Sequence, residues 1–313
     1  MLFIGNQIRL ARPLLAAAVE QRRTSLFQTL ARQQVEAGAN WLLVDMGPQR
    51  RNAADDLAWL VQTIHAEISV PLALRSDDPA ALEAGLQAAR DTVLLDATLP
   101  GVTDPVAASQ SDTGSYLSLA RRYGAKLAVS ACPGGLPTPT EERLTLVTEM
   151  LVPRVLGGGL ALADLYVDPL TVALTCDQPM VPTTLETLRL LKVAADPAPN
   201  TMVHLDDVTD GLADLGKSYV TQAYVTMLLA VGVDALVANR QDPDLVDVMR
   251  VVSERDPATD YDRLLVRLYD VTKADLDLDI ASVDQTDPRQ VALFKTVQVL
   301  SNSAIYVDGY LRG

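Results

Sequence analysis

The sequence predicts an α/β protein, built as a (β/α)8 TIM barrel with a C-terminal extension. Eight short aliphatic runs alternate with helical stretches over roughly 250 residues, which is the usual length of such a barrel. The chain has 313 residues and is 49% hydrophobic but only 4% aromatic. An aliphatic core of this kind is typical of parallel sheets covered by helices. Several runs also end in a charged residue, at the position where barrels keep their chemistry.

The first part of the chain supplies five strands and the helices that follow them. Aliphatic and β-branched runs predict strands at residues 2–5, 41–45, 70–74, 92–95 and 126–130. Helical patterns follow at residues 12–23, 25–37, 55–67, 78–89, 115–123 and 140–151. Gly38 and Gly124 end two of these helices. Asp78 and Pro79 begin another, because Asp is a good N-cap and Pro a good first helical residue.

The second part completes the count. A strand at residues 165–167 ends at Asp168 and Pro169, since proline cannot donate to a sheet ladder. Two further strands are expected at residues 201–205, before Asp206 and Asp207, and at residues 234–238. Helices are expected at residues 183–194, 218–231 and 242–252. The main competitor is a doubly wound open sheet, but no Gly-x-Gly-x-x-Gly follows any strand.

The domain organisation follows from this count. Residues 1–255 form the barrel, and residues 256–313 form a helical extension packed on the barrel or on a dimer partner. Helices are expected in the extension at residues 261–272 and 288–300, on either side of an acidic irregular stretch. In the second helix, Leu293, Phe294, Val297 and Leu300 form one apolar face, which argues against a solvated tail.

Composition excludes several classes of function. The formal net charge of −14 argues against partners made of nucleic acid and against anionic membrane surfaces. Only two cysteines occur, so a disulfide scaffold is not expected and a reducing cytoplasm fits. No apolar stretch is long enough for a membrane helix, and the chain opens on a strand rather than on a signal peptide. His65 is expected on a solvent-facing helix surface, and Cys132 as a small buried residue.

The candidate site consists of charged residues at strand ends. Asp45 ends a predicted strand, and Arg75, Asp96, Asp168 and Asp207 each come just after one, so the five side chains are expected to converge at one end of the barrel. Burial penalises so many carboxylates in one place. Protonation of one or more of them, neutralisation by Arg75, or a bound hard cation would relieve this penalty, and the sequence leaves these three alternatives open. No metal site is assigned.

Short motifs at these strand ends resemble those of a known family. The matching segments are residues 1–5, 34–39, 44–47, 70–72, 166–170 and 230–235, together with Ser76 and Pro79. Over residues 1–252, the chain resembles the pterin-binding barrels. It is most similar to the methyltetrahydrofolate:corrinoid/iron–sulfur protein methyltransferases and more distantly similar to dihydropteroate synthase.

The resemblance implies a methyltransferase that moves a methyl group between a tetrahydrofolate-type donor, such as methyltetrahydrofolate, and a corrinoid carried by a partner protein. It implies a cytoplasmic homodimer. In this family the Asp of the Asp-Pro motif, here Asp168, holds the pterin ring, together with residues at the positions of Arg75 and Asp96. Asp45 is a further candidate for ligand binding. Asp207 takes the position of a residue near N5 of the pterin, where the methyl group leaves, and is the catalytic candidate.

The chain departs from the family pattern at several of these positions. Arg75 stands where the family has Asp, and Asp96 and Asp207 stand where it has Asn. An ionised Asp can accept two hydrogen bonds from the amide and amine of a pterin, whereas Arg has only donors to offer. Two alternatives follow. The barrel could be catalytically degenerate and act as a binding or scaffold protein, or Arg75 could grip an altered, anionic substrate.

Overall fold

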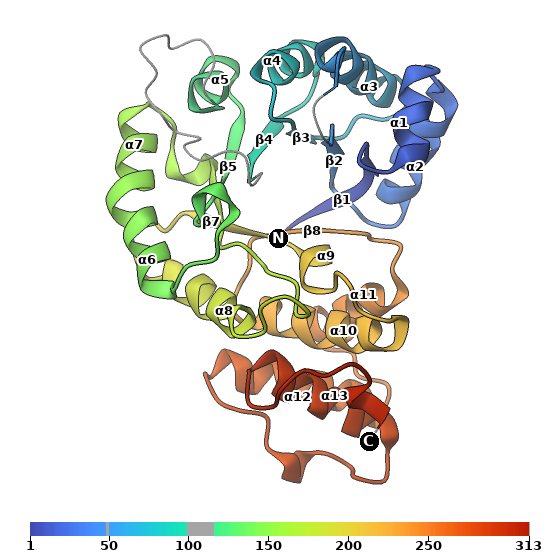
Figure 1. Cartoon of the computed structure of the whole chain (residues 1–313), viewed down its shortest axis with the longest axis vertical. Helices are drawn as coiled ribbons and strands as arrows, with labels where there is room; N and C mark the ends of the chain where they lie inside the picture. Colours follow the sequence, from blue (N-terminus) through green and yellow to red (C-terminus); the bar gives the residue numbers. More distant parts are fainter. Residues whose placement is uncertain (48–49, 99–115, 313) are drawn as a thin grey trace. The chain divides into compact units, whose positions relative to one another are not determined.

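The computed structural model describes residues 1–47, 50–98 and 116–312. Eight parallel strands form a closed barrel in which they are neighbours in chain order, with β1 next to both β2 and β8 (Figure 1). The strands are β1 Leu2–Arg9, β2 Trp41–Asp45, β3 Leu72–Arg75, β4 Val93–Ala97, β5 Lys126–Ser130, β6 Leu165–Asp168, β7 Asn200–His204 and β8 Ala235–Ala238. Helices alternate with the strands along the chain and continue after β8. The prediction of a (β/α)8 TIM barrel followed by C-terminal helices is therefore confirmed.

The chain divides into two compact units. The first unit contains Met1–Leu170, Leu191–Val203 and Asp234–Arg240, and the second contains Thr171–Leu190, His204–Val233 and Gln241–Gly313. The helices of the first unit are α1 Pro13–Glu20, α2 Thr24–Glu36, α3 Ala53–Glu67, α4 Pro79–Ala88, α5 Tyr116–Tyr123, α6 Thr140–Thr145 and α7 Val152–Gly157. In Figure 1, α2 to α5 lie outside the strands of this unit.

The inside of the barrel is filled by side chains at alternate strand positions. The cluster comprises Ile4, Trp41, Leu43, Ala73, Leu94, Ala128, Tyr166, Met202, Ala235 and Val237. Because strand side chains alternate between the two faces, the residue two positions after each of these points to the same side. Asp45, Arg75, Asp96 and Asp168 each stand two positions after a member of this cluster. These four side chains therefore belong to the polar layer above the apolar core.

The first strand is longer than its aliphatic pattern predicts. β1 runs from Leu2 to Arg9, and its register with β2 shifts between Gly5 and Ile8. The backbone N–H of Gln7 donates to Oε1 of Gln34 on α2 at 2.9 Å. A Cβ at Gly5 would lie 2.6 Å from the same oxygen, so any larger residue at this position would displace the side chain of Gln34. The irregularity interrupts the alternation of side chains, which is why the sequence pattern ends early.

Several helices differ from expectation, and two of the differences have a clear physical reason. Residues 140–151 were predicted to form one helix, and instead α6 continues through the π-helical segment η2, Leu146–Leu151, into α7. Pro153 explains the wider turn, because it has no N–H and its ring crowds the carbonyl four residues earlier. His65 is buried on α3, where Nε2 lies 3.1 Å from the carbonyl oxygen of Val70 and Nδ1 accepts from the N–H of Arg90 at 3.2 Å. The expectation that His65 faces solvent is wrong.

The second unit is helical. Its helices are α8 Met180–Leu191, α9 Leu205–Val208, α10 Asp214–Ala230, α11 Pro243–Val248, α12 Asp260–Lys273 and α13 Pro288–Leu300, with the π-helical segment η4 Met249–Ser253 after α11. The long helix α10 packs against α11, α12 and α13. Leu293, Val297 and Leu300 are buried on α13, as its apolar face predicts, whereas Phe294 of the same face is only half-buried. The side-chain amide of Gln178 donates to the carbonyl oxygens of Val299 and Ala304, which fixes the end of α13.

Candidate functional site

Four of the predicted residues lie at the carboxyl ends of neighbouring or nearby strands of the first unit. Asp45 and Arg75 are the last residues of β2 and β3, Asp168 is the last residue of β6, and Asp96 is the last but one of β4. Because all strands of the closed barrel run parallel, these ends meet at one rim, which we call the barrel mouth. Asp45 and Arg75 also form a register pair between β2 and β3.

Asp45 is held by a guanidinium and by the backbone. Its Oδ2 lies 3.6 Å from Nε of Arg9, the residue opposite it in register on β1. Its Oδ1 accepts a hydrogen bond from the N–H of Gly47 at 2.9 Å. The side chain of Asp45 is 8% exposed. The ion pair with Arg9 offsets part of the cost of burying this charge.

Arg75 and Asp96 form the second ion pair of the mouth. Nε of Arg75 lies 3.8 Å from Oδ2 of Asp96, and the two side chains are 12% and 1% exposed. Oδ1 of Asp96 accepts hydrogen bonds from the N–H and the hydroxyl of Thr98, at 3.1 and 2.7 Å. Of the three ways to relieve the cost of burying several carboxylates, neutralisation by Arg75 is the one that the structure shows at Asp96.

Tyr116, at the start of α5, lies close to this pair. Its hydroxyl donates to the carbonyl oxygen of Ser76 at 2.6 Å. Burial raises the pKa of Tyr116 well above its usual range, the negative charge of Asp96 raises it further, and Arg75 lowers it. Tyr116 is therefore a neutral hydrogen-bond donor beside the mouth at any physiological pH.

Asp168 is oriented by the turn that follows it. Its Oδ1 accepts a hydrogen bond from the N–H of Leu170 at 2.8 Å, and Leu170 adopts a left-handed conformation with a φ of 68°. Asp168 is 4% exposed and lies opposite Ser130 in the register of β5 and β6. The same turn occurs at Asp45, Asp96 and Asp168: each carboxylate accepts a hydrogen bond from the backbone N–H two residues later. This bond fixes the orientation of the carboxylate in the absence of a ligand.

Asp207 is not at the end of a strand. β7 ends at His204, and Leu205–Val208 form the short helix α9, so the prediction of a strand through residue 205 is wrong. Acidic residues are favourable in the first turn of a helix, which explains why Asp206 and Asp207 begin a helical turn. Asp207 belongs to the second unit. Its convergence with the four residues of the mouth stays a prediction.

Several polar residues at or near the mouth were not singled out from the sequence. Arg9 was hidden by the irregular register of β1, which masks the strand pattern. Ser130 could have been found from alternation, since it stands two positions after Ala128 of the core. Arg143 looks like an ordinary surface residue of a helix, yet it is completely buried. Tyr116 is also buried, and its aromatic side chain alone gave no signal of a polar role.

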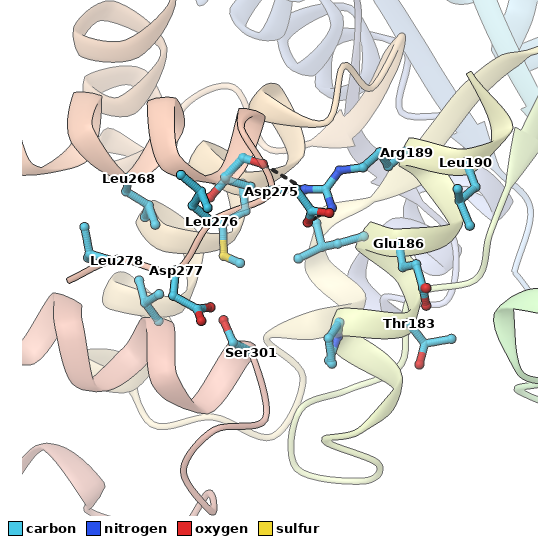
Figure 2. A pocket seen from close by; sticks show the side chains of 15 residues that line it. Thr183, Glu186, Arg189, Leu190, Leu268, Asp275, Leu276, Asp277, Leu278 and Ser301 are labelled. Atoms are coloured by element: carbon cyan, nitrogen blue, oxygen red, sulfur yellow. Dashed lines mark hydrogen bonds and ion pairs between the residues drawn. The ribbon is translucent and has the colours of Figure 1, made fainter. Parts of the chain in front are cut away.

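The second unit contains a separate cavity of about 490 Å³, shown in Figure 2. Leu268, Leu278 and other apolar side chains line it, and Glu186 and Asp277 add acidic groups. Arg189 is paired with Asp275 and donates to the carbonyl oxygen of Thr272 at 2.8 Å, so its charge is compensated within the wall. None of the five residues singled out from the sequence lines this cavity.

The described ranges contain neither a metal site nor a membrane-spanning helix. Within them, no group of three or more His, Cys, Asp or Glu side chains is arranged to hold a metal ion. In the same part of the chain, no helix combines the length and apolar character needed to cross a bilayer. Both cysteines are free, and Cys132 is buried as expected.

In barrel proteins, the carboxyl ends of the strands are where polar ligands bind, and here this rim carries oriented carboxylates and arginines. No protein-family model matches the chain. A methylcorrinoid:tetrahydrofolate methyltransferase of Eubacterium limosum is 23% identical over 273 residues, which cover 84% of this chain and 93% of that protein. The chain is a distant homologue of this methyltransferase.

Solved structures agree on the fold. A dihydropteroate synthase from Thermus thermophilus matches with a TM-score of 0.58 and 18% identity, over 81% of this chain and 93% of that chain. A dihydropteroate synthase from Yersinia pestis matches with a TM-score of 0.57 and 13% identity, over 81% and 92%. The resemblance to the pterin-binding barrels is thus confirmed, as distant homology to the methyltransferase and as a shared fold with the synthases.

Proposed function

We propose that this protein transfers a methyl group between a tetrahydrofolate-type pterin and a corrinoid carried by a partner protein. The observation that carries the proposal is Asp168, a buried carboxylate held at the end of β6 by the N–H of Leu170. The relative named as a methylcorrinoid:tetrahydrofolate methyltransferase supports it, because the likeness extends over 93% of that protein. We further propose that the protein acts in the cytoplasm as a homodimer.

The pterin is bound through its amide and amine edge. Those groups are donors, and the carboxylate of Asp168 accepts two hydrogen bonds in a fork. Arg75 would repel this edge if its charge were uncompensated, but Asp96 lies 3.8 Å away and offsets it. Asp96 and Arg75 therefore act as one nearly neutral wall of the site, and Asp45 with Arg9 as a second.

Methyl transfer at N5 of the pterin also needs a group on the protein that donates or accepts a proton. A methyl group leaves N5 of a pterin more easily when that nitrogen gains a proton, so a general acid near N5 lowers the barrier. We assign this role to Asp207, whose carboxyl group would have to be protonated to donate. In the reverse direction the same group accepts the proton. The corrinoid, carried by the partner, supplies the site that gives or takes the methyl group.

Calorimetric titration with methyltetrahydrofolate tests the proposal. We expect binding in the micromolar range for the native protein and a loss of at least about tenfold for Asp168→Asn, because the amide accepts at only one of its two heavy atoms. Asp287→Asn is a matched control, since Asp287 also accepts from an N–H two residues on, that of Arg289, but caps α13. It should bind as the native protein does.

The outcome separates this proposal from its alternatives. No heat at millimolar ligand would argue strongly against a pterin site. Co-purification with a corrinoid protein without methyl transfer would indicate a scaffold. Loss of turnover of an anionic substrate in folded Arg75→Ala would indicate an enzyme of altered specificity.

A further inference from the structure

Arg143 on α6 is a charged side chain in the interior of the barrel unit. It is 0% exposed and is the largest of the fully buried side chains. Removing a guanidinium from water is costly unless its donors are hydrogen-bonded. An apolar side chain of similar size would fill the same space without that cost. The guanidinium must therefore contribute something that packing alone does not.

Its hydrogen bonds tie two loops together. Nε donates to the carbonyl oxygen of Thr138, and Nη1 donates to the carbonyl oxygen of Pro169, both at 2.7 Å. Thr138 lies in the loop after β5, and Pro169 directly follows Asp168 at the end of β6. A planar guanidinium with several fixed donors suits such a bridge, whereas a lysine ammonium is a point charge on a flexible stem.

A second donor reaches the same carbonyl from the loop after β5. Sγ of Cys132 lies 3.6 Å from the carbonyl oxygen of Pro169. The N–H of Cys132 donates to Oγ of Ser130 at 3.0 Å, and Ser130 is the register partner of Asp168. The Pro169–Leu170 peptide is therefore held from two sides, by α6 and by the loop after β5.

We propose that Arg143 is a positioning residue that sets the orientation of the Asp168 carboxylate. The carbonyl of Pro169 and the N–H of Leu170 belong to one planar trans peptide, so a bond that holds the carbonyl also fixes the direction of the N–H. This N–H donates to Oδ1 of Asp168 at 2.8 Å. The role in ligand binding rests on the proposed function. The geometric part, from Arg143 to the carboxylate, is independent of which ligand Asp168 receives.

Hydrogen exchange of the Leu170 amide measures the geometric part directly. In Arg143→Lys we expect this amide to exchange at least about tenfold faster, because an ammonium on a flexible stem holds the two carbonyls less rigidly than a planar guanidinium and the turn opens more often. Asp168→Asn should also speed this exchange. Arg189→Lys is the matched control, since Arg189 also donates to a backbone carbonyl, that of Thr272, in the second unit. It should leave the Leu170 amide unchanged.

Calorimetry with methyltetrahydrofolate measures the functional part. We expect the dissociation constant of Arg143→Lys to rise at least about tenfold. Faster exchange with unchanged affinity in the folded variant would overturn the role in binding. If the native protein binds no methyltetrahydrofolate, the proposed function fails, and the exchange result still decides the geometric part.

A milder variant protects the test against misfolding. Cys132→Ala removes the thiol, which lies 3.6 Å from both the Pro169 carbonyl oxygen and Oγ1 of Thr138, and alanine fits wherever the larger cysteine fits. We expect a severalfold increase in Leu170 exchange, smaller than that in Arg143→Lys. Unchanged exchange of the Leu170 amide in Cys132→Ala and in any folded variant of Arg143 would overturn the proposal.

Discussion

Arg75 and Asp96 place opposite charges 3.8 Å apart in a part of the barrel mouth that water barely reaches. The sequence alone raised the question of how several carboxylates could be buried together. The charge of Asp96 is compensated by the guanidinium of Arg75 and by two hydrogen bonds from Thr98. Since removing one partner of a buried pair costs more than removing both, the pair can be tested by a double-mutant cycle.

Arg75→Met should destabilise the protein by about 2 kcal/mol, because Asp96 loses the cation that compensates its charge. The double variant Arg75→Met/Asp96→Asn should recover most of this loss. Urea unfolding of the native protein, Arg75→Met, Asp96→Asn and the double variant measures the coupling energy between the two residues. Arg122→Met breaks an exposed ion pair with Glu83 and should cost under about 1 kcal/mol. Additive effects of the Arg75 and Asp96 substitutions would contradict a coupled pair.

Tyr116 predicts a specific loss of stability at high pH. Its pKa is raised in the folded state, first by burial and then by Asp96. Its contribution is therefore complete below the unfolded pKa of about 10 and is lost as pH rises toward the folded pKa. Tyr116→Phe should be less stable at pH 7, by about 1 kcal/mol for the hydrogen bond to Ser76. The difference should shrink at alkaline pH, and a difference that is constant with pH would refute this explanation.

The residues that the sequence revealed and those it hid differ in a simple way. Asp45, Arg75, Asp96 and Asp168 each follow an aliphatic run, so periodicity alone placed them at strand ends. Arg143 gave no such signal, because a charged residue on a helix normally faces water. Arg143 donates to the carbonyl oxygens of Thr138 and Pro169, and these come within reach of its guanidinium only in the tertiary fold. The same holds for His65, which is buried by backbone groups of other segments.

At the level of elements, α12 begins with a capping box. The hydroxyl of Thr259 accepts from the N–H of Asp262 at 3.1 Å, and the carboxylate of Asp262 accepts from the N–H of Thr259 at 3.1 Å. Thr259→Ala removes one half of this exchange and should cost about 1 kcal/mol in the free energy of unfolding. Arg267→Ala, on the exposed face of the same helix, should change it by less than about 0.5 kcal/mol. Equal effects in denaturant unfolding would argue against the cap.

Element boundaries show where local pattern is insufficient. The strand expected at residues 201–205 ends one residue early, because Leu205-Asp206-Asp207 forms a helical turn instead of extending the strand. An aliphatic leucine fits both structures, and only the acidic residues after it favour a helix start. In α6 to α7, the pattern predicted a helix correctly but could not indicate the π-helical segment before Pro153.

At the scale of the whole molecule, the division between the barrel and the C-terminal extension at residue 256 stays a proposed domain boundary. Within the second unit, α10 packs against α12 and α13, which bury Leu264, Leu268, Leu293 and Leu300. Deleting residues 256–313 would expose the apolar surface of α10, so we expect the shortened chain to aggregate or to melt at a clearly lower temperature. Sedimentation and thermal unfolding measure this. A monodisperse shortened protein with the native melting temperature would show that the extension is dispensable.

Gly5 lies where helix α2 packs against the irregular part of β1, the strand that carries Arg9 to the rim of the barrel. Any side chain there would push against Gln34 of α2, which anchors the N–H of Gln7 in the irregular part of β1. Beyond that irregularity the strand carries Arg9 to its place opposite Asp45. We therefore expect substitution of the buried Gln34 to shift Arg9 relative to Asp45, and with it the charge at the entrance, although Gln34 itself lies on α2 and not at the rim.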